Sequence, residues 1–153
     1  MSGRSAARGT IVVVEDNPML LQGLDRALTA SGYRVETASC GEAALEMLES
    51  VDFDPDLLLL DVMMPGLSGF DVLRTLRADP ERKHVPVVMI TAATDRSVRE
   101  TAHHQGATDL LIKPFHLGEL LERIDRHVGS GHRGSRRDAP TRQDRRVLHP
   151  PAG

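Results

Sequence analysis

The sequence of 153 residues is poor in residue types that several kinds of function require. Cys40 is the only cysteine, which excludes an internal disulfide and a cysteine-based metal cage. Tryptophan is absent and there are only one Tyr and three Phe, too few for a platform on which nucleic-acid bases stack. No apolar run approaches the roughly 18 residues of a membrane span. The first nine residues, MSGRSAARG, also lack the apolar stretch of a secretory signal, so we expect a cytoplasmic protein with no membrane segment.

Charge is distributed unevenly along the chain. Residues 1 to 128 contain 13 Lys and Arg against 20 Asp and Glu, a net charge of −7, whereas residues 129 to 153 contain 6 against 2, a net charge of +4. An acidic body argues against a folded surface for nucleic acid, so no direct nucleic-acid partner is expected. The arginines of the last segment could contact nucleic acid or anionic lipid by charge alone, but a solubilising tail is the simpler interpretation.

Short apolar runs alternate with segments of helical periodicity between residues 10 and 128. The runs that predict buried strands are Thr10 to Val14, Arg34 to Ala38, Asp56 to Leu60, Pro86 to Ile90 and Leu110 to Ile112. The segments that predict helices are Pro18 to Ser31, Gly41 to Ser50, Ser68 to Ala78, Asp95 to Gln105 and His116 to Val128. Repeated βα units with short connections predict a doubly wound α/β domain, in which helices cover both faces of a five-stranded parallel sheet.

Residues at the ends of these segments support their limits. Gly32 and Gly106 stand where helices end, and Ser68 and Asp95 stand where helices begin. In the last helical segment an apolar stripe at three- and four-residue spacing is expected to cover the sheet, and it consists of Leu117, Leu120, Leu121, Ile124 and Val128.

The domain limits follow from this pattern. We predict one domain over residues 10–128, preceded by a flexible N-terminus, residues 1–9. Residues 129–153 have no periodicity and are dense in Gly, Ser, Pro and Arg, which predicts a disordered basic tail.

Polar residues follow the predicted strands at the ends that a parallel sheet brings to one edge, where ligands of such sheets bind. Glu15 and Asp16 follow the first strand, Asp61 the third, Thr91 the fourth and Lys113 the fifth. Carboxylates gathered there repel one another, because at 4 Å and an effective dielectric constant near 20 each pair costs on the order of 4 kcal/mol. A cation is therefore expected between them.

The donor types at this edge indicate which cation and which chemistry. Carboxylate oxygens, a main-chain carbonyl and water suit Mg²⁺ rather than zinc. A carboxylate nucleophile, Mg²⁺, the Lys113 ammonium and the Thr91 hydroxyl are sufficient for phosphoryl transfer. Asp61 is the best candidate nucleophile because it ends an apolar run. The segment that follows it, Met63 to Gly66, could form a tight turn that directs a main-chain carbonyl at the metal.

Four segments of the sequence, VVVEDN, LLLLDVMMPGLSGFDVL, VVMITA and LLIKPF, resemble the signature segments of bacterial response-regulator receiver domains of the CheY-like superfamily. The resemblance extends from about Thr10 to Val128, and it implies a flavodoxin-like fold with strand order 2-1-3-4-5 and five helices. It implies that Asp61 is the phospho-acceptor and that Asp61, Asp16 and the Met63 carbonyl bind Mg²⁺. Glu15 would then act mainly through water.

The same resemblance implies further roles and partners. Thr91 and Lys113 would bind phosphoryl oxygens, and the peptide bond between Lys113 and Pro114 would be cis. The phosphoryl donor would be a phosphohistidine of a sensor histidine kinase or phosphotransfer protein, and a downstream protein would bind in response. The chain would be a signalling module that catalyses only its own phosphorylation and dephosphorylation, not an enzyme for external substrates.

Two departures from the family pattern affect the expected output. Leu110 stands where the family often has Tyr or Phe, a ring whose rotation accompanies movement of the residue equivalent to Thr91, so we expect altered switching with the chemistry retained. The last 25 residues are too few for an output domain. We therefore expect a stand-alone receiver that binds its target, or a second copy, through segments 95–105, 110–112 and 116–128.

Two other functions would use part of the same set of residues. A Mg²⁺-dependent phosphohydrolase of the haloacid-dehalogenase type would form a similar aspartyl phosphate, but it needs a second Asp two positions after the nucleophile, where this chain has Met63. A degenerate receiver that binds its partner without phosphorylation is the other alternative. Only Leu110 favours that alternative, because the acidic residues, Thr91 and Lys113 are all present.

Overall fold

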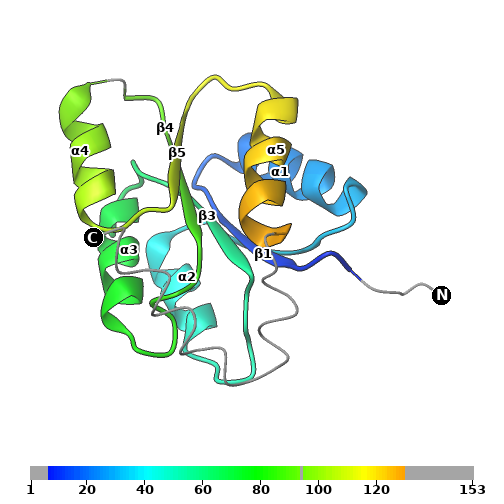
Figure 1. Cartoon of the computed structure of the whole chain (residues 1–153), viewed down its shortest axis with the longest axis horizontal. Coiled ribbons are helices and arrows are strands. Elements are labelled where there is room, and N and C mark those ends of the chain that lie inside the picture. Colours follow the sequence, from blue (N-terminus) through cyan, green and yellow to red (C-terminus); the bar gives the residue numbers. More distant parts are fainter. Residues whose placement is uncertain (1–6, 94, 130–153) are drawn as a thin grey trace.

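The structure is a computed structural model that describes residues 7–93 and 95–129, in which five strands and five helices alternate (Figure 1). The strands are β1 (Thr10–Val14), β2 (Arg34–Ala38), β3 (Leu57–Asp61), β4 (Val87–Thr91) and β5 (Asp109–Ile112). The helices are α1 (Pro18–Ala30), α2 (Gly41–Leu48), α3 (Gly69–Ala78), α4 (Arg96–His104) and α5 (Leu117–Gly129).

The strands form one parallel sheet in the order β2-β1-β3-β4-β5. The strand order reverses between β1 and β3, which are neighbours in the sheet although β2 separates them in the sequence. In sheets of this kind, ligands bind at such a switch point, outside the carboxyl ends of the strands. The predicted fold class and strand order are confirmed.

Helices cover both faces of the sheet, with α1 and α5 on one side and α2, α3 and α4 on the other (Figure 1). Successive residues of β1 serve the two sides alternately: Ile11 and Val13 pack with α1 and α5, whereas Val12 and Val14 pack with α2 and α3. Because both faces are buried, β1, β3 and β4 are apolar except at one terminal residue each, rather than alternately apolar and polar.

Most predicted limits agree with the structure to within one residue. β3 and β4 each begin and end one residue later than predicted, because the ladder pairs Asp61 with Ile90 and Thr91 with Ile112. The largest difference is at the end of α2, which stops at Leu48 rather than at Ser50.

The predicted positions of all four residues at helix ends are confirmed. Gly32 and Gly106 have φ angles of 99° and 90°, a backbone conformation that favours glycine just after a helix. Ser68 accepts a hydrogen bond from the Asp71 amide, and the Asp71 side chain accepts one from the Ser68 amide, which together form a capping box. Asp95 occupies the N-cap position of α4 but its side chain makes no capping hydrogen bond.

The predicted stripe on α5 is correct except at its first residue. Leu120, Ile124 and Val128 are buried against the sheet, and Leu121 is partly buried beside them. Leu117 is 48% exposed, contrary to the prediction. It is the first residue of α5 and follows the end of β5 at Ile112 by five positions.

The fold extends slightly beyond the predicted domain. The Arg8 amide donates to the Gly32 carbonyl and the Arg34 amide donates to the Gly9 carbonyl, both at 2.9 Å, so backbone pairing begins before Thr10. Residues 1–6 of the predicted flexible N-terminus and residues 130–153 of the predicted tail lie outside the described residues. No helix in the described part of the chain is long and apolar enough to cross a membrane.

Candidate functional site

Three acidic side chains meet at the carboxyl ends of β1 and β3. Glu15 and Asp16 directly follow β1, and Asp61 is the last residue of β3. One carboxylate oxygen from each of the three lies within 4.8 Å of the others. The convergence that was predicted from the parallel direction of the strands is therefore present, at the switch point of the sheet.

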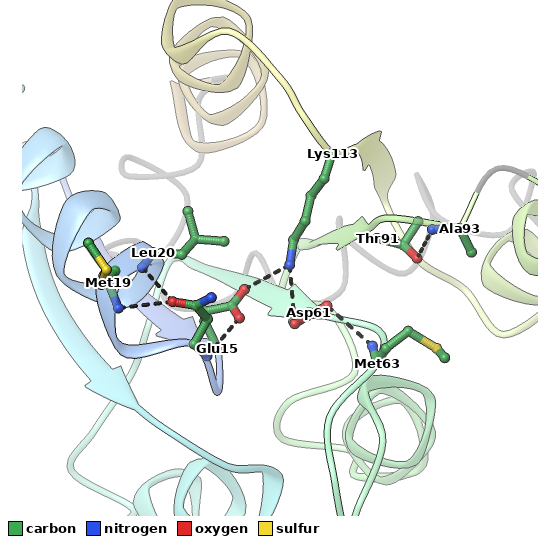
Figure 2. A network of polar contacts seen from close by, with 9 residues as sticks. Glu15, Met19, Leu20, Asp61, Met63, Thr91, Ala93 and Lys113 are labelled. Carbon is green, nitrogen blue, oxygen red and sulfur yellow. Dashed lines mark hydrogen bonds and ion pairs between the residues drawn. The ribbon is translucent and has the colours of Figure 1, made fainter.

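Lys113 joins two of these carboxylates (Figure 2). It directly follows β5, and its Nζ lies 3.3 Å from Glu15 Oε1 and 3.4 Å from Asp61 Oδ2. The Lys113 to Pro114 peptide bond is cis, as predicted. With all four groups ionised, one positive charge faces three negative ones. The cluster therefore retains a net charge of −2, which a bound cation would offset.

Glu15 is the most buried of the three acids, with only 1% of its surface exposed. Burial raises the pKa of its carboxyl group, and the nearby charge of Asp61 acts in the same direction. Two contacts oppose that rise in pKa: the Asn17 amide donates to Glu15 Oε2 at 3.0 Å, and Lys113 attracts the carboxylate. Asp16, by contrast, is exposed at the mouth of the cluster.

Asn17 has a double role that the sequence analysis missed. Besides holding Glu15 through its amide, it begins α1 with its side chain, whose Oδ1 accepts hydrogen bonds from the Met19 and Leu20 amides at 3.0 and 3.1 Å. The signal was present in the sequence, because Asn directly before a proline is a common helix start. Asn17 therefore fixes both the helix and the acidic loop in front of it.

Asp61 is held at both carboxylate oxygens. Oδ1 accepts a hydrogen bond from the Met63 amide at 3.2 Å, Oδ2 faces Lys113, and only 3% of the residue is exposed. The Met63 side chain points to solvent, and its carbonyl as a metal ligand stays a prediction.

The chain beyond Asp61 depends on a glycine. A Cβ atom at Gly69 would stand 2.2 Å from the Asp61 carbonyl oxygen and 2.9 Å from Val62 Cα. Only glycine therefore allows the first turn of α3 to lie against the end of β3. This close approach was not predicted, because a glycine three residues after a turn has no single interpretation in sequence.

Thr91 reaches the same edge of the sheet but stands apart from the charged cluster. It is fully buried, and its hydroxyl oxygen accepts a hydrogen bond from the Ala93 amide at 3.0 Å (Figure 2). The Lys113 amide donates to the Thr91 carbonyl at 2.7 Å, but within the described residues no hydrogen bond connects the Thr91 hydroxyl to Lys113 or to the three acids. Its hydroxyl hydrogen remains able to donate to a ligand in the site.

Leu110 lies in β5 beside Met89 of β4 and is partly buried against the core on the α4 side. With Ala102 and Ile112 it lines a groove of about 340 Å³ between α4 and β5. Its role in switching stays a prediction.

The donor set fits Mg²⁺. All three clustered side chains are carboxylates, and in the described part of the chain no histidine or cysteine joins the group. Hard oxygen donors that leave coordination positions open for water and phosphate are the kind that Mg²⁺ takes. Net negative charge and exposure of Asp16 at the mouth are compatible with entry of the ion from solvent.

The chain matches the family described as the response regulator receiver domain over residues 11–125. Among curated proteins, it is 45% identical over 114 residues to the response regulator PleD of Caulobacter vibrioides, covering 74% of this chain and 25% of PleD. It is 41% identical over 115 residues to the phosphate regulon transcriptional regulatory protein PhoB of Rhizobium meliloti, covering 74% of this chain and 49% of PhoB. The chain thus spans about a quarter to a half of these relatives.

Solved structures agree with this match. The receiver domain of the sensor histidine kinase PA1611 from Pseudomonas aeruginosa, whose active-site cleft coordinates a magnesium ion, superposes with a TM-score of 0.74 at 33% identity, covering 82% of this chain and all of that one. The chemotaxis protein CheY4 of Vibrio cholerae gives a TM-score of 0.73 at 30% identity, covering 80% of this chain and 99% of that one.

Proposed function

The chain belongs to the response regulator receiver domain family, and on that premise we propose that its Asp61 accepts a phosphoryl group from a phosphohistidine of a sensor histidine kinase or phosphotransfer protein. The observation that carries the assignment to Asp61 is the cluster of three carboxylate oxygens within 4.8 Å, with Lys113 against two of the acids. Among those acids, Asp61 is the one that combines burial with a position at the end of a central strand.

The proposed transfer is a single displacement at phosphorus. An Asp61 carboxylate oxygen forms the new O–P bond while the N–P bond of the donor breaks. The electron pair of that bond returns to the imidazole, which leaves neutral when its other nitrogen carries a proton. Lys113 neutralises charge on the transferred oxygens, and the Thr91 hydroxyl donates to one of them.

Asp16, Asp61 and the Met63 carbonyl are the proposed protein ligands of Mg²⁺, with Glu15 acting mainly through water. When bound, the ion supplies positive charge that offsets both the carboxylate repulsion and the charge on the phosphoryl oxygens. Steady hydrolysis of an external phosphoester is disfavoured, because Met63 cannot act as an acid or base two positions after Asp61.

The assignment of Asp61 is tested by phosphorylation of the purified chain with acetyl phosphate and Mg²⁺, followed by intact-protein mass spectrometry. The wild-type chain is expected to gain one phosphoryl group. No gain is expected when EDTA is present during the loading step, because it removes Mg²⁺. Asp61→Asn should remain unmodified, and the exposed control Asp52→Asn should be modified as fast as wild type. Equal modification of Asp61→Asn would refute the assignment.

The proposed output is phosphorylation-dependent protein binding or homodimer formation through α4, β5 and α5. Support comes from the groove between α4 and β5, which Leu110 lines. Leu110 lies in β5, the strand that pairs with β4, which ends at Thr91. Capture of partners by the full chain with beryllofluoride and Mg²⁺ is expected to differ from capture by Asp61→Asn. Identical captures, together with identical sedimentation of the two proteins, would contradict a phosphorylation-dependent output.

A further inference from the structure

An acidic groove of about 420 Å³ lies at the edge of the sheet formed by β2, between the start of that strand and the loop that joins α2 to β3. Its lining residues are Thr10, Arg34, Glu36, Asp52, Phe53 and Asp54. Three carboxylates therefore face one guanidinium. The groove is remote from the phosphorylation site, because Thr10 and Arg34 open their strands whereas Asp61 closes its strand.

The negative charge of the groove is only partly balanced within the fold. Asp54 lies 3.9 Å from an Arg82 nitrogen. Glu36 and Asp52 are exposed, and within residues 7–93 and 95–129 neither forms an ion pair at 4 Å or less. The loop also presents apolar surface, since Val51 is 90% exposed and Phe53, which lines the groove, is only partly buried against the core.

The chain itself contains a segment with the complementary composition. Residues 142–148 read RQDRRVL, in which three arginines precede an apolar pair. Acidic and apolar residues alternate in the groove loop, Val51 to Asp54, and basic and apolar residues are adjacent in this segment. The charge of −7 on the body and +4 on the last 25 residues favours the same pairing.

The exit point of the chain makes this pairing geometrically feasible. α5 ends at Gly129, and the preceding Val128 lies 3.3 Å from where a Cβ of Gly9 would stand. Gly9 directly precedes Thr10, a residue of the groove wall. The sixteen residues from 130 to 145 can span up to about 53 Å, compared with a radius of gyration of about 14 Å for a domain of this size.

We propose that residues 142–148 dock in the acidic groove of the same molecule. Arg145 and Arg146 pair with Glu36 and Asp52, and Val147 and Leu148 cover Val51 and Phe53. Individual surface ion pairs are weak, but tethering supplies a high effective concentration. The contact is therefore populated at low ionic strength and released by salt.

Paramagnetic relaxation in the full chain tests the proposal. A nitroxide is attached to Thr141→Cys in a Cys40→Ser background, and amide intensities are followed in the ¹⁵N-labelled protein. We expect intensity loss at Glu36, Asp52 and Phe53 and not at Glu100 on α4. The loss should disappear between about 20 mM and about 500 mM NaCl, as the screening length falls from roughly 20 Å to roughly 4 Å.

Matched charge reversals identify the two partners. The pair R145E and R146E should abolish the intensity loss, whereas R136E and R137E, which change the tail charge equally, should retain it. On the body, E36K with D52K should abolish it, whereas E100K with E122K should retain it. The assignment would be overturned if R136E with R137E reduced the intensity loss as much as R145E with R146E. It would also be overturned if E100K with E122K reduced the intensity loss as much as E36K with D52K. Either result would indicate diffuse attraction between tail and body.

Mixing distinguishes the same molecule from a second copy. Spin-labelled chain without ¹⁵N is added to ¹⁵N-labelled chain without a nitroxide. Docking within one molecule predicts no intensity loss in this mixture. Loss at Glu36 and Asp52 as large as in the doubly labelled chain would overturn docking in cis in favour of an exchange between copies, and absence of loss in every sample would overturn docking altogether.

Discussion

Glu15 illustrates how single residues prepare the site for a cation. Its carboxyl group is almost fully buried beside Asp61, so ionisation requires a charge to leave water next to another negative charge. Lys113 and the Asn17 amide offset only part of this cost, because the pKa of Glu15 remains raised. The acidic cluster is therefore assembled at an expense in stability that a bound cation would relieve.

Stability of the metal-free protein should accordingly depend on pH through Glu15. The raised pKa means that the folded state keeps the proton where the unfolded state has lost it. The contribution of Glu15 to stability is therefore full below its ordinary pKa of 4.5 and is lost as the pH rises through the pKa of the folded state. Each unit of that rise in pKa corresponds to about 1.4 kcal/mol.

Glu15→Gln removes this dependence. In urea denaturation with EDTA, its free energy of unfolding relative to wild type is expected to increase as the pH rises from about 4 to about 7. Glu46→Gln on the exposed face of α2 serves as the control and corrects for a change of carboxylate to amide. The account would be disproved if the free energy of unfolding of Glu15→Gln, relative to wild type, stayed constant or decreased over this pH range.

The sequence predicted the charged residues of the site better than the polar ones. Glu15, Asp61 and Lys113 could be placed because every parallel strand delivers its following residue to the same edge. The bond between Thr91 and Ala93 could not, since it depends on the backbone of a loop whose conformation has no periodic signature. The same limit applies to the close approach of Gly69 to Asp61.

At the scale of elements, two helices that begin with similar sequence signals begin differently. Ser68 forms a capping box with Asp71 at the start of α3, whereas Asp95 forms no side-chain capping bond at the start of α4. The stability that each cap supplies should differ accordingly. α3 directly follows the loop after Asp61, so its cap also supports that segment.

Alanine substitution at the two caps should show this contrast. Ser68→Ala is expected to lower the free energy of unfolding by about 1 kcal/mol, because it removes the hydroxyl oxygen that accepts from the Asp71 amide. Asp95→Ala should lower it by less than about 0.5 kcal/mol, since no bond to the cap is removed. Chemical denaturation measures both, and equal losses would show that the capping geometry does not decide the stability.

The end of α2 shows why one helix limit was predicted wrongly. The guanidinium of Arg82 donates to the carbonyls of Leu48 and Ser50 at 3.0 and 2.8 Å, and it comes from the loop between α3 and β4. These carbonyls need a partner once the helix stops. Arg82 lies 34 and 32 residues further along the chain, beyond the reach of any local pattern.

For the whole molecule, Mg²⁺ binding should stabilise the fold, because only the folded chain brings the acids together. At a concentration ten times the dissociation constant the gain is about 1.4 kcal/mol, equivalent to a rise in Tm of about 5 °C for a domain of this size. Asp16→Asn should lose most of this rise and Asp52→Asn should keep it. Differential scanning fluorimetry measures the shift, and an undiminished rise in Asp16→Asn would exclude Asp16 as a ligand.

The overall fold was largely predictable because one signal was repeated five times. Alternation of apolar runs with helical segments fixed the class, and the resemblance supplied the strand order. What escaped prediction were contacts between elements, such as the exposure of Leu117 beyond the end of β5. Such contacts depend on where the elements end in space. A periodic pattern in the sequence carries no information about those positions.

The ion pair between Lys113 and Glu15 spans 98 positions of the chain, and Lys113 follows the last strand to be synthesised. A growing chain on the ribosome therefore carries all three acids long before it carries the ammonium that joins them. The positive charge that faces Glu15 and Asp61 is therefore in place only after β5 has been synthesised and has added to the edge of the sheet.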